Sequence, residues 1–194
     1  YPDFDANDLR NTLDRLAGEV GNRLQPQDTP LQVVEKLTQY LFHEKGFSGN
    51  TKNYFDADNS YFNKVLLCGT GIPITLSVLC ILIGKRLDLP IFGVGMPAHF
   101  IAKYDAPEGT VYFDPFNKGR ILTKADCAGI VRQFGFEFEE RFLDATDNRQ
   151  ILLRMIHNLI MAYNQTEQPE RLNQLQEYTA ILTAPGTENY SNSI

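Results

Sequence analysis

The sequence predicts an α+β fold in which a buried helix precedes a small antiparallel sheet, with further helices at both ends. Residues 73–87 are apolar on nearly every side, which is typical of a helix at the centre of a domain. Three short runs rich in β-branched and aromatic residues follow at 91–96, 99–104 and 110–113, and these predict strands. Outside this region, apolar residues recur at the three- and four-residue spacing of amphipathic helices.

Two amphipathic helices are predicted before the buried one. Residues 6–24 carry leucine and valine at helical spacing, and Asp5 or Asn7 is a suitable N-cap. Residues 29–45 repeat the pattern, with Pro30 in a position that suits a first helical turn. We expect these helices to lie antiparallel to each other.

A short mixed segment links these helices to the buried one. Residues 47–53 have the composition of a loop, and residues 59–67 predict a short helix capped by Asp58 or Asn59. Pro73 then begins the buried helix, because proline lacks the N–H that a first turn leaves unpaired.

After the predicted sheet the chain returns to helical patterns. Residues 123–134 predict a helix capped by Thr123, and two further helices are predicted at 147–163 and 169–182. That last pair is either a hairpin packed on the domain or the first unit of a helical repeat, and no second copy follows it. The polar tail from Ala184 is expected to fray.

These predictions divide the chain into a main domain over residues 1–146 and a C-terminal helical hairpin over residues 147–194. The chain begins at Tyr1 and not at methionine, which indicates a processed or trimmed N-terminus. The oligomeric state is not predicted by any of these patterns.

Composition and charge argue against nucleic acid and membrane as partners. The 194 residues are 43% hydrophobic and 22% charged, which suits a globular domain. A net charge of -6 opposes attraction to nucleic acid phosphates and anionic lipid. The longest apolar run, residues 74–83, is far too short for a membrane span. Three cysteines without metal-ligand spacing predict a reducing, cytoplasmic compartment, no metal site and no cofactor.

His99 and Asp114 form the candidate constellation for chemistry. His99 opens the second predicted strand and Asp114 closes the third, so a hairpin of these strands brings both to one edge of the sheet. A carboxylate orients the histidine in nucleophilic enzymes, and the same contact also serves binding sites and stability. The nearby aromatic residues Tyr54 and Phe55 either line a groove or pack in the core.

Four blocks in this order resemble the successive signatures of the SirB family, which is transglutaminase-like. They are Asn59-Ser60-Tyr61-Phe62-Asn63, Gly71-Ile72-Pro73-Ile74-Thr75-Leu76-Ser77, Pro97-Ala98-His99-Phe100 and Asp114-Pro115-Phe116-Asn117-Lys118-Gly119. The resemblance extends over residues 1–182, and residues 151–159 resemble the family's tetratricopeptide-like tail. It implies a papain/transglutaminase-like core with helix, His strand and Asp strand in that order.

The resemblance also implies a missing nucleophile. Enzymes of this superfamily place their cysteine at the start of the helix, a position that falls here on Pro73 or Ile74. The implied function is a non-catalytic adaptor or regulatory module, a pseudoenzyme whose former active-site cleft binds a peptide segment of another protein. The predicted cleft residues are Asn59, Asn63, Gly71, Pro73, Ser77, His99, Asp114 and Asn117.

The alternative function is a cysteine-dependent hydrolase or acyltransferase with Cys68 as nucleophile, His99 as base and Asp114 as the residue that orients it. Against it, the neighbours of Cys68 supply neither a helix N-terminus nor a positive charge to favour the thiolate. The hydroxyls of Thr75 and Ser77 near the helix start are expected to bond to the backbone of the preceding turn.

Overall fold

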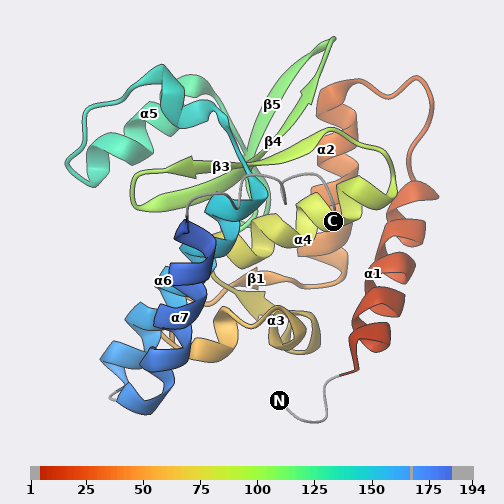
Figure 1. Ribbon diagram of the computed structural model, residues 1–194. Coiled ribbons are helices and arrows are strands. Elements are labelled where there is room, and N and C mark those ends of the chain that lie inside the picture. Colours follow the sequence, from red (N-terminus) through yellow and green to blue (C-terminus); the bar gives the residue numbers. More distant parts are fainter. Residues whose placement is uncertain (1–4, 167, 185–194) are drawn as a thin grey trace.

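The computed structural model describes residues 5–166 and 168–184, which are arranged around one central helix (Figure 1). The helices are α1 (Ala6–Gly21), α2 (Pro30–Thr38), α3 (Phe62–Cys68), α4 (Pro73–Arg86), α5 (Lys124–Gln133), α6 (Asn148–Gln165) and α7 (Leu172–Thr183). A π-helix, η1 (Gln39–Glu44), and the 3₁₀ turns η2 (Ala57–Asn59), η3 (Glu140–Leu143) and η4 (Pro169–Arg171) complete the helical elements of these residues. The strands are β1 (Ser48–Gly49), β2 (Thr70–Gly71), β3 (Ile91–Met96), β4 (His99–Ala106), β5 (Gly109–Asp114), β6 (Arg120–Leu122) and β7 (Ala145–Thr146).

The main sheet is antiparallel, with the strand order β6-β5-β4-β3-β7. The pairing of Met96 with His99 closes the β3–β4 hairpin, and the pairing of Asp114 with Arg120 closes the β5–β6 turn. The predicted α+β class and its three central strands are confirmed. The short strands β1, β2, β6 and β7 were not predicted, because two or three residues are too few to show an alternating pattern.

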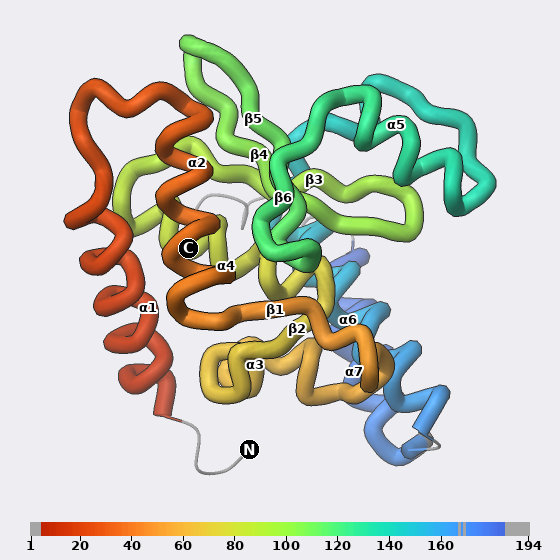
Figure 2. Tube along the Cα trace, turned by 180° about the vertical axis from the view of Figure 1, so that it is seen from behind, coloured from red at the N-terminus to blue at the C-terminus, as the bar shows by residue number. Residues whose placement is uncertain are grey.

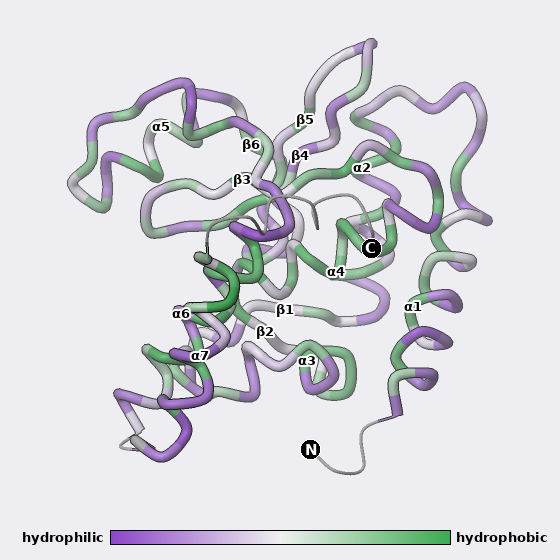
Figure 3. The backbone as a smooth tube through the Cα atoms, viewed as in Figure 1, coloured by the Kyte–Doolittle hydropathy of each residue, from purple (hydrophilic) through white to green (hydrophobic). Residues whose placement is uncertain are grey.

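Helix α4 is the centre of the molecule, as the apolar run predicts. Figure 2 shows helix α4 from behind, with α1 and α2 on one side of it and the strands β3, β4 and β5 above it. Lys85 and Arg86 in its last turn lie where the helix dipole favours positive charge. Figure 3 shows the hydrophobic colouring of α4 against the more polar outer helices. The helix is therefore held by burial on several sides.

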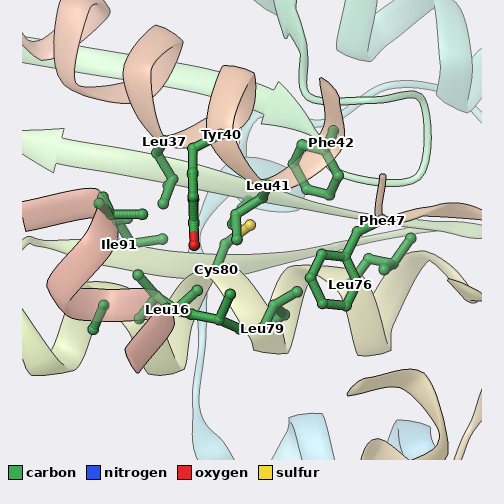
Figure 4. Close-up of a cluster of buried hydrophobic side chains, with 14 of the residues drawn as sticks. Leu16, Leu37, Tyr40, Leu41, Phe42, Phe47, Leu76, Leu79, Cys80 and Ile91 are labelled. Carbon is green, nitrogen blue, oxygen red and sulfur yellow. The ribbon is translucent and has the colours of Figure 1, made fainter. Parts of the chain in front are cut away.

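The largest core cluster lies between α4 and the N-terminal helices (Figure 4). Leu37 and Leu41 from the α2–η1 segment meet Leu76 and Leu79 from α4, and all four side chains are fully buried. Each such leucine contributes about 1.5–3 kcal/mol through burial. This packing fixes the start of α4 relative to the strands that follow it.

The N-terminal helices begin where predicted, but they end differently. The Asp5 side chain accepts a hydrogen bond from Asn7 N, and Thr29 and Gln32 form a capping box at the start of α2. Helix α1 ends at Gly21 and not at residue 24, and the second helix changes to a π-helix at Gln39. A spacing of apolar residues does not distinguish an α-helix from a single π-helical turn.

The predicted start of the third helix is wrong, because α3 begins at Phe62 and not at residue 59. Asn59 cannot cap it, since its side chain accepts from Asn50 Nδ2 and donates to the carbonyls of Asn53 and Tyr54. The residue is buried inside the loop that it organises. Asn59 therefore holds the 50–59 loop in place.

The C-terminal helices form the predicted hairpin, with shifted ends. Asp147 caps α6, which continues to Gln165, and α7 begins at Leu172 after the turn η4. Helix α6 contacts both α4 and α7, so the hairpin rests on the central helix. The predicted fraying from Ala184 concerns residues 185–194, which lie outside the described residues.

Candidate functional site

The structure brings His99 and Asp114 together at one edge of the sheet. His99 Nε2 lies 2.8 Å from Asp114 Oδ2, across the β4–β5 pair. The Asp114 side chain is only 2% exposed, whereas His99 is 12% exposed and so reaches the surface. The carboxylate is therefore the inner member of the pair and the imidazole the outer one.

Asp114 accepts hydrogen bonds on both carboxylate oxygens. Oδ1 accepts from the backbone N–H groups of Phe116 and Asn117 at 3.0 and 3.2 Å, and Oδ2 accepts from Asn117 Nδ2 at 2.8 Å. Burial alone raises the pKa of Asp114, but the hydrogen bond and charge of His99 and the bonds from Asn117 outweigh it, so the pKa lies below its ordinary value. At neutral pH the carboxylate is charged, which fixes the His99 proton on Nε2 and leaves the Nδ1 lone pair free in the neutral ring.

The start of α4 carries no available nucleophile. Pro73 is buried, and the Thr75 hydroxyl accepts from Ile72 N at 3.1 Å and donates to the carbonyl of Asn59 or Ile72. The buried Ser77 hydroxyl donates to the Pro73 carbonyl at 2.9 Å. Both hydroxyls thus bond to backbone groups, as expected for such residues near a helix start.

The three cysteines do not complete a catalytic site in the part of the chain that the structure describes. Cys68 is the last residue of α3 and is exposed, and its sulfur makes no hydrogen bond to His99. Burial raises the pKa of the Cys80 thiol, and it raises the pKa of Cys127 to about 11. Cys80 and Cys127 are therefore protonated and inert at neutral pH.

Several predicted cleft residues lie in the interior. His99, Asp114 and Asn117 form one hydrogen-bonded group, and Asn117 is exposed. Asn63 is half-buried on α3. The remaining predicted members are buried and do not line an open surface: Asn59, Gly71, Pro73 and Ser77.

The accessible surface beside His99 is aromatic. The Phe116 ring lies 6.4 Å from the His99 ring and 6.1 Å from that of Tyr54, which stacks edge-on against Phe55. Tyr54 and Phe55 are 39% and 46% exposed. A Cβ at Gly49 would lie 2.5 Å from Phe116 Cδ2, so this ring position requires glycine there. We call His99, Phe116, Tyr54 and Phe55 the aromatic surface.

Arg154 is a site residue that the sequence did not reveal. From α6, its Nη1 donates to the Met96 carbonyl at 2.9 Å and its Nη2 donates to the His99 carbonyl at 2.8 Å. Its guanidinium also lies 5.4 Å from the centre of the Phe100 ring, and burial lowers the pKa of Arg154. The turn it holds includes Ala98, whose φ of 58° is rare for a residue with a side chain.

Residues 5–166 and 168–184 contain neither a metal site nor a membrane-spanning helix. These residues contain no group of three or more His, Cys, Asp or Glu side chains that is arranged to hold a metal ion. They also include no helix whose length and apolar character would let it cross a membrane.

Comparisons with known proteins give a family and related proteins. Residues 7–157 match the family model described as transglutaminase-like superfamily. A UPF0162 protein of Xylella fastidiosa is 35% identical over 182 residues, which are 88% of this chain and 63% of that protein. Human F-box only protein 21 is 31% identical over 137 residues, 66% of this chain and 21% of that protein. The chain thus spans less than two thirds of these relatives, and no solved structure matches it.

Proposed function

This chain belongs to the transglutaminase-like superfamily, and we propose that it is a non-catalytic member that binds a peptide segment of another protein. The observation that carries the proposal is the start of α4, where Pro73 is buried and the neighbouring hydroxyls bond to backbone groups. The His99–Asp114 pair is present, and no hydrogen bond joins it to a thiol in the described residues. A pair that holds an imidazole at the surface serves recognition as readily as catalysis.

The aromatic surface supplies the chemistry that peptide binding needs. Exposed aromatic rings give large contact areas for little loss of side-chain entropy, and such rings are enriched at protein interfaces. His99 Nδ1 accepts a hydrogen bond from a peptide N–H, and the exposed Asn117 adds polar groups at the rim. From the cleft predicted by sequence, this proposal keeps the hydrogen-bonded group of His99, Asp114 and Asn117 and replaces the other members by Tyr54, Phe55 and Phe116.

The proposal includes the finer assignments of the sequence resemblance. These are membership of the SirB family, a cytoplasmic adaptor role, and a division into residues 1–146 and a tetratricopeptide-like hairpin over residues 147–194. In support, α6 and α7 pack against each other, and α7 exposes Tyr178 and Ile181 as a second contact surface.

A peptide selection tests the binding proposal. A random peptide library displayed on phage is panned against the purified protein, and the selected peptides are measured by fluorescence anisotropy. We expect Tyr54→Ala and Phe55→Ala each to weaken binding at least about tenfold, because exposed aromatic anchors dominate such interfaces.

The matched control is Phe134→Ala, since Phe134 is 54% exposed at the end of α5, outside the aromatic surface. Binding by this variant should equal that of the wild type. Selected peptides that lose as much affinity with Phe134→Ala as with Tyr54→Ala, or no selected peptides at all, would refute the proposal.

The alternative, a hydrolase or acyltransferase that uses Cys68, makes an opposite prediction about thiol reactivity. We expect the alkylation rate of Cys68, followed by peptide mass mapping, to be the same in the wild type and in His99→Ala, because the exposed Cys68 makes no hydrogen bond to His99 in the described part of the chain. A rate that falls clearly in the variant would show an activated thiolate and would favour the enzyme.

A further inference from the structure

A hollow lies between the N-terminal helices and the β5–β6 turn, and its volume is about 890 Å³. Small-molecule sites commonly measure about 300–1,000 Å³. Residues of α2 and η1 line one wall, residues 117–120 line the other, and Arg23 lies beside them. Segments that are far apart in the sequence therefore enclose one space, which we call the basic pocket.

The lining of the basic pocket is positively charged, although the whole chain carries a net charge of -6. Four cations against two carboxylates leave a net charge of +2 without any contribution from His43. The cations are Arg23, Lys36, Lys118 and Arg120, and the carboxylates are Glu35 and Glu44. The lining residues alone are thus opposite in sign to the chain as a whole, which favours an anionic ligand, although Lys36 and Arg120 also pair with carboxylates outside the lining.

The charge available to a ligand lies on the β5–β6 turn. Arg23 is paired with Glu44 at 2.6 Å, and Lys36 is paired with Asp28 at 2.7 Å. Lys118 forms no ion pair with any residue that the structure describes. Among the described residues, Arg120 forms an ion pair with Asp126 alone, at 3.3 Å on the surface. Exposed pairs of this kind are weak and exchange readily for a better partner.

At Lys118 the backbone of this turn has a conformation that is unfavourable for a residue with a side chain. Lys118 has a φ of 57°, and Gly119 has a φ of 74° with its Cα so close to α2 that a Cβ would lie 2.4 Å from Thr38 Cβ. The bonds from Asn117 to Asp114 fix the other end of the turn. Left-handed backbone costs free energy and is concentrated at ligand sites, where it aims particular side chains.

We propose that the basic pocket binds a small molecule carrying a phosphate monoester, whose phosphate contacts Lys118 and Arg120. A phosphate monoester carries close to two negative charges at neutral pH, which balances the net charge of the lining. A guanidinium presents paired donors to phosphate oxygens, and an ammonium adds a point charge. Thr38, Gln39 and His43 border the space left for the organic part of the ligand.

Phenyl phosphate is the probe for this site, titrated into ¹⁵N-labelled protein at constant ionic strength while amide shifts are followed by NMR. We expect saturable shifts confined to Arg23 and residues 35–44 and 117–120. Lys118→Gln and Arg120→Gln should each weaken binding about tenfold, because each removes a charge-assisted contact. Glu35→Gln should tighten binding, because it removes a negative charge from the pocket wall.

The matched control is Lys85→Gln, an exposed lysine on α4 outside the pocket, which should leave the dissociation constant unchanged. Benzenesulfonate, a single negative charge on a similar body, should bind more weakly than phenyl phosphate. Shifts that do not saturate, or an equal loss of affinity with Lys85→Gln, would overturn the site. Inorganic phosphate binding as tightly as phenyl phosphate would overturn the assignment to a monoester of a small molecule.

Discussion

Replacing Asp114 with alanine is expected to lower the free energy of unfolding by about 3–5 kcal/mol, the usual cost of removing one partner from a buried charged network. Four donors then lose their acceptor: His99 Nε2, the N–H groups of Phe116 and Asn117, and Asn117 Nδ2. Because the carboxylate is 2% exposed, water does not replace it without rearrangement of the turn. Urea denaturation at neutral pH measures the loss.

The control for Asp114→Ala is Asp105→Ala on the neighbouring strand. Asp105 also accepts from a hydroxyl and an ammonium, but its side chain is 38% exposed. An exposed pair of this kind is worth about 1 kcal/mol or less. A loss at Asp114 no larger than the loss at Asp105 would show that the His99–Asp114 network is not a stabilising element.

The same carboxylate sets a dependence of stability on pH. Its pKa is lowered in the folded protein, so its contribution is fully present above the unfolded-state pKa of about 3.9 and is lost as the pH falls through the folded pKa. Asp114→Asn removes this titration. The difference in stability between wild type and Asp114→Asn should therefore shrink on acidification, and a constant difference would contradict the shift.

Replacing Arg154 with methionine is expected to cost about 2–4 kcal/mol, because two charge-assisted hydrogen bonds disappear and two carbonyls lose their donor. Methionine keeps much of the packing against Phe100, so the loss reports mainly on the polar contacts. Arg154→Lys should recover only part of the stability, since an ammonium does not reproduce a guanidinium that spans the Met96 and His99 carbonyls.

Hydrogen exchange separates this local effect from general destabilisation. Amide exchange in the β3–β4 turn should accelerate in Arg154→Met more than exchange in α1, because the guanidinium holds that turn directly. Arg132→Met, on the exposed end of α5, should change stability by no more than about 0.5 kcal/mol. Uniform acceleration throughout the protein would argue against a specific role for Arg154 at the turn.

The correct predictions, the central helix and the three long strands, rest on patterns of residues that are close together in the sequence. The apolar run that begins at Pro73 predicted the central helix, and the strand runs placed His99 and Asp114 on neighbouring strands. Arg154 was missed because its partners are backbone carbonyls more than fifty residues away, and no side-chain pattern marks them. The burial of Asn59 was missed because a polar residue beside a helix also suits an exposed cap.

The position of Arg154 on α6 also constrains how this architecture is inherited. A recombination event that joined a foreign C-terminal hairpin after residue 146 would discard the guanidinium beneath the histidine turn. The matched family region continues to residue 157 and therefore retains it. A chimera that keeps this guanidinium at the turn must therefore be joined after Arg154, so the first half of α6 belongs structurally with the sheet.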